Sequence, residues 1–595
     1  MKLSDEQERL VDLALKGHNV LVDACIGSGK TTTIQQLCLR LPRNKKLVYL
    51  TYNKLLKEDA QSKIKYRLRM YRNNNHNFEI TNYNGFAYKY LKEMGISVGI
   101  SEQINRFNIE KPKIIVPDIL IVDEYQDIRE DHAEMLRYIK STNPKMQIIM
   151  VGDMVQKIYS NTALNVISFV KEFMGEYKEI SFTKCFRVNK EWGNILGEIW
   201  GKEINGVNDD CIIKTMSFNQ FLSFVKDRET SEILCLGAKM GLANKALNIL
   251  EKEYPLKFNK KTVYASIADR DANIPIDRNT AIFTTFDSSK GMERDFCFVF
   301  DWTEKYWTSR ISQTGTEYEI LRNLFCVAAS RGKRGIVFVL DDEEKLLSKA
   351  VLKTKVETNY KYNTFLNISE MFDHKFEEDV RECFNLLNIK EKKKRDKSYI
   401  DVKVTDEKID LSPCIGKYQE ACFFKNFSME NEYKLFNKTT NNYHLDFNKV
   451  KNKSLDEQIC TLIAASTRQD RYKTQVEYPI ITENEKLKII NRLKKVFNYS
   501  ETAQKECFVD LQIVKAVGYA DVVKNNIVYE LKFVSELQPT HFLQCAMYMI
   551  ALNIRKGVVW NVRTNEIYEI EIKNKRDFLN AVVKTITKRH TQNIF

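Results

Sequence analysis

The sequence predicts an α/β protein whose first part is built on parallel sheets and whose tail is a separate α+β unit. Through residues 1–345, short apolar runs such as KLVYLTY, DILIVDE and MQIIMVGD alternate with longer amphipathic stretches. This alternation is typical of buried parallel strands joined by helices. Several of the runs end in polar residues, at the edge where open α/β sheets bind ligands. From about Tyr399 to the end we expect the second, α+β unit.

The composition sets broad limits on the function. A chain of 595 residues predicts about three to five folding units. The net charge of +14 favours a polyanionic partner, because Lys and Arg that neutralise phosphates release counterions. The 13 cysteines include no CxxC pair, which disfavours structural zinc and a disulfide framework. The polar N-terminus and the lack of a long apolar run predict a cytoplasmic or nucleoid-associated protein with no membrane partner.

A glycine-rich turn follows the first apolar strand. The segment ACIGSGKT, which begins at Ala24, lies between NVLVDA and the helical pattern TTTIQQLCLRL. In such a turn, backbone N–H groups approach phosphate oxygens closely, a lysine reaches the β- and γ-phosphates and a threonine hydroxyl binds Mg²⁺. Ala24 departs from the strict pattern, which has Gly there. We therefore predict that ATP and Mg²⁺ are bound by Gly27, Ser28, Gly29, Lys30, Thr31 and Thr32.

Two later strand ends carry groups suited to ATP hydrolysis. The run ILIV ends in Asp123 and Glu124, and Gln156 follows the run IIMVGD. Asp123 suits the Mg²⁺ shell, and Glu124 suits activation of the attacking water, because hydrolysis needs a base within one hydrogen bond of that water. Gln156 can sense the γ-phosphate or hold the water.

The tail contains a second arrangement of acids and lysine. Asn525 and Asn526 separate two β-rich runs in IVKAVGYADVVKNNIVYELKFV, and Asn tolerates the positive φ of a two-residue hairpin turn. That register places Asp521 opposite Glu530, with Cβ atoms roughly 5 Å apart, and puts Lys532 on the same face. Such close acids repel unless a cation lies between them, and Mg²⁺ or Mn²⁺ prefers these ligands. The alternative is a charged pair on a sheet surface.

Two further segments, around Pro539 and at residues 390–397, need interpretation. Pro539 predicts the start of a helix, on which Gln544 and Tyr548 share one face and His541 is a polar residue rather than a ligand. The basic run KEKKKRDK, residues 390–397, is either a solvated linker or a DNA contact.

The early motifs, with further segments in the same order, resemble superfamily 1 helicases of the UvrD/Rep type over residues 3–340. The further segments are TYNK, TNYN, FR, TTFDSSKGME and VAASRG. The resemblance implies two RecA-like parallel-sheet P-loop domains that close on ATP and step along DNA. It implies nucleotide contacts from Gln7, Phe186 and Glu293, and γ-phosphate contacts from Arg187 and Arg331, whose charge would stabilise the transition state. It also implies DNA contacts from Tyr52, Asn53, Thr81, Tyr83 and Thr285.

The tail resembles the RecB-like branch of PD-(D/E)xK nucleases. The matching residues are Asp521, Glu530, Lys532, Gln544 and Tyr548, of which the resemblance places the last two near the nucleic acid. Glu477, in the upstream segment TQVEYPI, is expected to be the additional metal-binding acid. Relatives that hold an iron–sulfur cluster place cysteines around this core, but only Cys507 and Cys545 lie close, so we expect no cluster.

The expected organisation has four parts. They are a RecA-like domain 1A over residues 1–185 with a small 1B insertion near 60–115, a domain 2A over 186–345 with little or no 2B, a charged helical linker over 346–398 and the nuclease domain over 399–595. Three departures from the helicase pattern bring unwinding into question: Asp287 replaces the usual His, Ser160 and Asn161 stand where an aromatic is usual, and only about 100 residues separate Arg187 from Thr285.

These features predict an ATP-dependent DNA helicase or translocase, running 3′ to 5′ as the resemblance implies, with a metal-dependent DNA nuclease. Single-stranded DNA and duplex ends are the expected substrates, in repair, recombination or defence against foreign DNA, alone or with a partner subunit. One alternative is an ATP-gated DNA sensor with little unwinding. Another is a tail that grips DNA without cutting it. RNA is less favoured, because the form DEYQD resembles DNA translocases.

Overall fold

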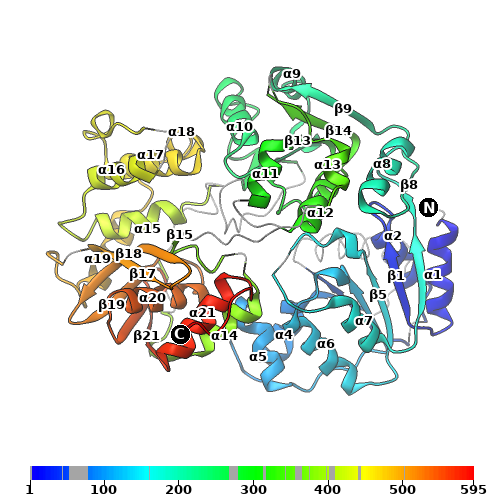
Figure 1. Ribbon diagram of the computed structural model, residues 1–595, viewed down its shortest axis with the longest axis horizontal. Coiled ribbons are helices and arrows are strands. Elements are labelled where there is room, and N and C mark those ends of the chain that lie inside the picture. The colour runs from blue at the N-terminus through cyan, green and yellow to red at the C-terminus, as the bar shows by residue number, and fades with distance from the viewer. Residues whose placement is uncertain are drawn as a thin grey trace.

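The computed structural model contains three large sheets, each in its own unit (Figure 1). We call residues 3–182 lobe 1, residues 184–355 lobe 2 and residues 365–595 the tail domain. The structure describes residues 3–42, 44–52, 78–159, 161–266, 279–312, 317–341, 344–355, 365–373, 375–396, 399–400, 409–439, 444–501 and 503–595. Within those ranges, no helix combines the length and the apolar character that crossing a bilayer requires.

Lobe 1 is a parallel six-stranded sheet in the order β3-β2-β4-β5-β1-β6, covered by helices on both faces. Its central strands are buried from end to end, which explains their continuous apolar runs. The strands are β1 Val20–Ala24, β2 Leu47–Thr51, β3 Phe78–Asn82, β4 Ile119–Asp123, β5 Gln147–Gly152 and β6 Lys178–Phe182. Helices α1 (Asp5–Leu15) and α2 (Lys30–Arg40) cover one face, and α4 (Tyr83–Glu93), α5 (Gln103–Glu110), α6 (Glu130–Thr142) and α7 (Val166–Met174) cover the other.

Lobe 2 repeats this plan with a parallel sheet in the order β11-β12-β10-β13-β14-β9. Its apolar core extends into lobe 1 and includes Cys25, Ile26 and Ile158. The strands are β9 Ile212–Ser217, β10 Ile233–Gly237, β11 Val263–Ser266, β12 Ala281–Thr285, β13 Arg294–Phe300 and β14 Gly332–Leu340. The helices are α8 Lys190–Trp200, α9 Phe218–Val225, α10 Leu242–Glu253, α11 Glu304–Ser312, α12 Tyr318–Ala328 and α13 Lys349–Lys353, and the short strands β7 (Lys184–Cys185) and β8 (Asn205–Gly206) pair beside them.

The tail domain is a mixed sheet in the order β15-β18-β19-β20-β21-β16, with β17 paired to β18. The strands are β15 Phe365–Asn367, β16 Leu387–Lys393, β17 Ala503–Asp510, β18 Lys515–Lys524, β19 Ile527–Lys532, β20 Lys556–Asn561 and β21 Glu566–Ile572. One face packs on α14 (Glu377–Asn385), α20 (Pro539–Ala551) and α21 (Lys575–Ile586). The other packs on α15 (Ser412–Ala421), α16 (Met429–Thr439), α17 (Leu455–Thr467), α18 (Arg471–Thr474) and α19 (Glu483–Leu493).

The predicted fold class is confirmed, but two predicted segments differ. The expected linker over residues 346–398 is wrong in part, because β15 pairs with β18 and β16 pairs with β21 in the tail sheet. Lysines fill β16 because it lies at the sheet edge, where charged side chains discourage pairing with other chains. The expected insertion near 60–115 falls partly on residues 53–77, outside the described residues. Residues 78–110 supply β3, α4 and α5 of lobe 1 itself.

Candidate nucleotide and nuclease sites

The turn between β1 and α2 presents bare backbone toward lobe 2. Gly27 and Gly29 adopt φ of 62° and 78°, in the left-handed region that favours glycine. Gly29 precedes α2 without a side-chain cap, so the first N–H groups of that helix are available to an anion. The buried Ser28 hydroxyl has no hydrogen-bond partner. Thr31 and Thr32 open α2 directly after Lys30. This turn is shaped to hold phosphate.

The acids of β4 lie against Lys30. The Lys30 Nζ donates to Glu124 Oε1 at 2.9 Å, and Asp123 Oδ2 accepts from the Tyr49 hydroxyl at 2.6 Å. Burial, and then the charge of Glu124, raise the pKa of Asp123 to about 6. Burial would also raise the pKa of Glu124, but Lys30 and Lys290 hold it well below its usual range. A divalent cation fits this site, because it would relieve the repulsion between the Asp123 and Glu124 carboxylates that contributes to the raised pKa of Asp123.

Lobe 2 contributes two arginines to the same cleft. The Arg187 guanidinium donates to Glu293 Oε2 at 2.7 Å and to the Ser330 carbonyl at 3.2 Å. Arg331 is buried and donates through Nε to the Val327 carbonyl at 3.1 Å. Burial, and then the neighbouring Arg187, lower the pKa of Arg331 to about 10, while the charge of Glu124 opposes that shift. Arg331 therefore lies within electrostatic reach of Glu124 of lobe 1, and Arg187 lies beside Gly27 of the turn.

The remaining predicted nucleotide contacts surround the turn. Gln7 Nε2 donates to the Ser28 carbonyl at 2.9 Å, and the exposed ring of Phe186 lies beside Gly29. Glycine is favoured at position 29 by its φ of 78°, and a Cβ there would come within 2.7 Å of Gln7 Nε2, so that the Gln7 side chain would have to move. Gln156 Nε2 donates to Asp153 Oδ2 at 2.8 Å, which places this amide at the base of the turn.

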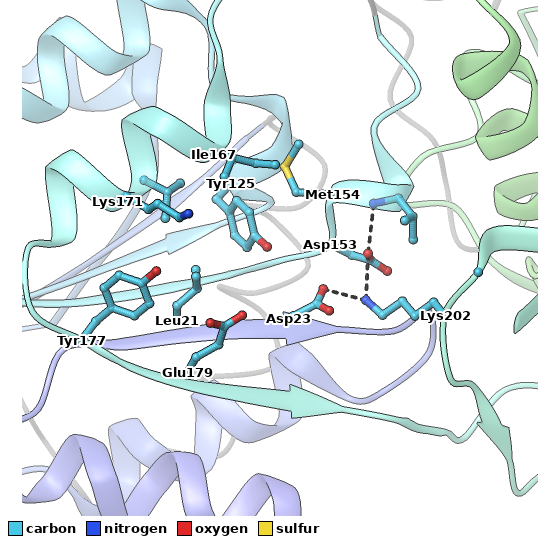
Figure 2. A pocket seen from close by; sticks show the side chains of 13 residues that line it. Leu21, Asp23, Tyr125, Asp153, Met154, Ile167, Lys171, Tyr177, Glu179 and Lys202 are labelled. Atoms are coloured by element: carbon cyan, nitrogen blue, oxygen red, sulfur yellow. Dashed lines mark hydrogen bonds and ion pairs between the residues drawn. The ribbon is translucent and has the colours of Figure 1, made fainter.

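Two lysines of lobe 2 bind acids of lobe 1, and neither is among the site residues predicted from the sequence. Lys290 Nζ contacts Asp127 and lies 3.6 Å from Glu124 Oε2. Lys202 Nζ lies 2.6 Å from Asp23 Oδ1 and 2.9 Å from Asp153 Oδ1. Figure 2 shows the Lys202 ammonium between these two carboxylates, at one end of a pocket lined by α7, β1 and β6. Four acids of lobe 1 thus connect directly to lobe 2.

The residues expected to contact DNA fall into two groups. Tyr83 and Thr81 are buried, and the Tyr83 ring stacks on His132 at 4.1 Å, so the expectation that they contact DNA is corrected to a role in the core. Tyr52 is half-buried and stacks on Tyr159 at 6.3 Å, while Thr285 is half-buried at the end of β12. Asn53 lies outside the described residues.

The predicted hairpin of the tail domain is present. Asn525 and Asn526 adopt φ of 49° and 59°, and Val522 pairs with Tyr529 as the predicted register requires. Toward the open end of the hairpin, Asp521 Oδ2 accepts from the Leu531 N–H at 2.7 Å. That bond ties the first acid to the strand that carries the second.

Lys532 is held from two sides. Its Nζ lies 2.7 Å from Glu530 Oε1 and donates to Gln544 Oε1 at 2.8 Å. Gln544 Nε2 in turn donates to the Tyr548 hydroxyl at 3.1 Å. Tyr548 is buried beside Gly518, so the expected DNA contact is corrected to a role in positioning Gln544. His541 Nδ1 accepts from the Gln538 N–H at 2.9 Å and serves to cap α20.

The buried acids of the tail fit a divalent cation. Glu530 Oε2 is buried without a hydrogen-bond partner. Burial, and then the charge of Asp521, raise the pKa of Glu530 to about 8. Within the described residues, no group of three or more His, Cys, Asp or Glu side chains could hold a metal ion. A cation here would therefore be held by two carboxylates, with water and a substrate phosphate completing its shell, as Mg²⁺ often requires.

The additional acid is not the expected one. Glu477 has a side chain that is 70% exposed and lies 3.2 Å from Lys260 Nζ in lobe 2, so its prediction as a metal ligand is wrong. The buried acid that lies near the two sheet carboxylates is Glu420, on α15: it accepts a hydrogen bond from Gln504 of β17, and burial followed by the charge of Asp521 raises its pKa to about 8. No local pattern marks Glu420, because packing brings it to the strands from 100 residues away in the sequence.

The comparisons with known proteins agree with this division. Residues 7–162 match the model of an AAA domain, and residues 483–573 match that of the PD-(D/E)XK nuclease superfamily. No curated protein matches the chain. Similar solved structures include the DUF1998 helicase MrfA bound to DNA, with 11% identity and a TM-score of 0.33 over 57% of this chain and 46% of that one. A second is the Arterivirus nonstructural protein 10 helicase, with 12% identity and a TM-score of 0.31 over 58% of this chain and 64% of that one. A third contains two coordinating Pif1 helicases at forked duplex DNA, with 14% identity and a TM-score of 0.32 over 59% of this chain and 94% of that one.

The matched region thus spans about half of the MrfA chain. The two family matches coincide with the two sites described above: the first contains the glycine-rich turn and the acids of β4, and the second contains the hairpin and α20. The protein joins an N-terminal AAA domain to a C-terminal domain of the PD-(D/E)XK nuclease superfamily.

Proposed function

We propose that the protein moves along DNA by hydrolysing ATP and cuts DNA with a divalent metal ion. The observation that carries the proposal is the pair of separate buried sites, each with a lysine held against adjacent carboxylates: Lys30 with Asp123 and Glu124, and Lys532 with Asp521 and Glu530. Both arrangements suit reactions at phosphate, where placed charge supplies most of the catalysis.

In the nucleotide site, residues of both lobes would act on one ATP. Lys30 would exchange its contact with Glu124 for the β- and γ-phosphates, which frees Glu124 to accept a proton from the attacking water. Arg187 and Arg331 would stabilise charge on the transferred phosphate. A Mg²⁺ ion held by Thr31 and Asp123 would supply further charge neutralisation. Because the arginines come from lobe 2, hydrolysis would alter the contact between the lobes.

In the tail domain, Asp521 and Glu530 would hold the metal, and Lys532 would act on the water or on the charge of the transition state. The bound metal would polarise the scissile phosphate and lower the pKa of the attacking water. The Gln544 amide fixes the lysine before the substrate arrives, so little reorganisation is needed at the reaction step. We propose Mg²⁺ as the usual ion, with Mn²⁺ as a substitute.

The direction and the biological role rest on the resemblance to superfamily 1 helicases and RecB-like nucleases. We propose 3′ to 5′ movement on single-stranded DNA, entry at duplex ends, and a role in repair, recombination or defence against foreign DNA. A second candidate is an ATP-gated DNA sensor with little unwinding. Asn161, near the position of the usual stacking aromatic, instead donates to Glu377 of the tail domain at 3.0 Å, which favours this reduced activity.

The test compares wild type, Lys30→Ala and Lys532→Ala on single- and double-stranded DNA. We expect Lys30→Ala to lower ATPase by about 10²-fold or more, and Lys532→Ala to lower Mg²⁺-dependent cleavage by a similar factor while sparing ATPase. Displacement of streptavidin from single strands, measured beside displacement of a duplex strand, separates translocation from unwinding. If wild type hydrolyses ATP but cuts no DNA with any divalent metal, the tail only grips DNA.

A further inference from the structure

The tail domain has one helical layer on each face of its sheet, and we name each layer after one helix. The α14 layer consists of α14, α20 and α21, and the α17 layer consists of α15, α16, α17, α18 and α19. The two layers bury separate apolar clusters against opposite faces of the sheet. Sliding of packed layers past one another is a common form of conformational change in proteins.

The α14 layer is fastened to lobe 1. Arg129 donates to Glu377 at 2.6 Å, and Arg381 donates to both carboxylate oxygens of Glu102 at 2.8 and 3.0 Å. Just before α20, Glu536 accepts from the N–H and the hydroxyl of Ser101 at 3.2 and 3.0 Å. Figure 1 shows α14 and α21 beside α5 of lobe 1. Several hydrogen bonds from α14 and from the segment before α20 thus hold the tail domain to lobe 1, and we call this set of contacts the lobe 1 joint.

The α17 layer is fastened to lobe 2. The Asn248 amide, on α10, donates to the Arg468 carbonyl at 2.9 Å and accepts from the Asp470 N–H at 3.0 Å. Arg471 and Glu251 form an ion pair with side chains only 2% and 5% exposed. Figure 1 shows α17 and α18 close to α10. We call these contacts the lobe 2 joint. The tail domain thus contacts both lobes, through the α14 layer at lobe 1 and through the α17 layer at lobe 2.

The lobe 1 joint begins at the nucleotide site. Glu124 and Asp127, which meet Lys290 of lobe 2, lie on the same short segment as Arg129, which holds Glu377. A nucleotide that draws Lys30 away from Glu124 changes the charge balance of this segment. Movement of lobe 2 relative to it would pull on the α17 layer through Asn248.

The nuclease site lies across the seam between the α17 layer and the sheet. Glu420 and Lys417 come from α15, which packs on α17, whereas Asp521 and Glu530 come from the sheet. The hydrogen bond from Gln504 of β17 to Glu420 crosses that seam. The geometry points to a mechanical link in which the nucleotide state of the cleft sets nuclease activity by moving Glu420 and Lys417 against the acids of the sheet. This inference rests on the proposed nuclease function.

The test separates nucleotide state from movement along DNA. Cleavage of a single-stranded oligonucleotide is measured without nucleotide, with ADP and with a non-hydrolysable ATP analogue, none of which supports translocation. For wild type we expect the cleavage rate to differ by about fivefold or more between the nucleotide-free protein and the analogue complex, the low end of coupling between sites. Asn248→Ala, which loosens the lobe 2 joint, and Arg381→Ala, which loosens the lobe 1 joint, should bring that ratio below about twofold. Both variants should keep ATP affinity and metal-dependent cleavage without nucleotide.

Arg137→Ala is the matched control, because it removes an exposed ion pair with Glu172 of lobe 1 at 3.0 Å, away from both joints. It should keep the wild-type ratio. A ratio near one in wild type, or a full ratio in both joint variants, would overturn the link. Absence of cleavage in every nucleotide state would instead contradict the proposed nuclease, so the two failures can be told apart.

Discussion

The nucleotide site and the nuclease site use the same residue types but balance charge in opposite ways. In the nucleotide site, Lys30 and Lys290 both reach Glu124 and hold its pKa well below the usual range against the effect of burial. In the nuclease site, Lys532 is the one cation among the described residues that pairs with Glu530, and burial with the charge of Asp521 raises the pKa of Glu530 to about 8. The first site is ionised and assembled before its ligand arrives. The second keeps a proton until a cation replaces it.

Glu530→Gln gives the largest expected effect on this comparison. Loss of a metal-binding carboxylate should lower cleavage by about 10³-fold or more. Folding raises the pKa of Glu530 from 4.5 to about 8. The contribution of this group to the free energy of unfolding is therefore fully present below pH 4.5 and is lost as the pH rises through 8. The neutral amide avoids that loss, so the metal-free variant should be more stable than wild type by about 1–2 kcal/mol at pH 8.5 in urea unfolding.

The control for that variant is Glu483→Gln, at an exposed position on α19, which should change neither cleavage nor stability beyond about 0.5 kcal/mol. A Glu530→Gln protein that is less stable than wild type at pH 8.5 would show that the ion pair with Lys532 outweighs the repulsion from Asp521.

Glu124→Gln should have the opposite effect on stability. ATP hydrolysis should fall by about 10²- to 10⁴-fold, because the amide cannot accept the proton of the attacking water. Folding lowers the pKa of Glu124 from its usual value of 4.5. The ionised group therefore stabilises the folded protein above pH 4.5, and this stabilisation is lost as the pH falls below that value. The variant should therefore lose about 1–3 kcal/mol at pH 7. Binding of a fluorescent ATP analogue, measured alongside hydrolysis, should persist, and its loss would point to collapse of the turn instead.

The two sites also differ in how far the sequence predicted them. The structure has the glycine-rich turn, the acids at the end of β4 and the hairpin at Asn525 where the sequence places them, because each depends on neighbours in the sequence: a strand beside a turn, or two residues that adopt positive φ. The sequence does not predict Glu420 and wrongly predicts Glu477, because Glu420 reaches the strands only through packing of α15 on the sheet. Distance along the chain carries no information about such a contact.

The same reason explains the errors in the fold. The sequence predicts linker at β15 and β16 because β15 is only three residues long and the apolar–polar alternation of β16 stops after Ile389, where lysines and a glutamate follow. Tyr83 and Tyr548 were assigned to DNA by resemblance alone, yet both rings are buried. Motif spacing identifies which side chains gather at a site, but the surrounding packing decides which of them reach solvent.

The pH dependence of metal binding sharpens the comparison further. Mn²⁺ must displace the proton from Glu530, whose pKa lies at about 8, so its affinity should rise by about tenfold per pH unit below 8. Calorimetric titration at pH 6.5 and 7.5, in two buffers of different ionisation enthalpy, measures both the affinity and the proton release. Glu530→Gln should release fewer protons and show a shallower slope. An affinity that does not change with pH would mean that the acids are already ionised in the metal-free protein.

The smallest expected effect concerns the support of Lys532. Tyr548→Phe removes the hydroxyl that accepts from Gln544 Nε2, while the ring still fills its place beside Gly518. A single hydrogen bond contributes about 1 kcal/mol, so a loosened Gln544 should lower cleavage by about three- to tenfold and leave ATPase unchanged. Tyr519→Phe, on the same sheet but with its hydroxyl beside Glu506, is the matched control. A loss beyond about 100-fold would mean that the Tyr548 hydroxyl contacts DNA directly, as the resemblance implied, and that the nuclease site opens further in its working state than the arrangement around Lys532 indicates.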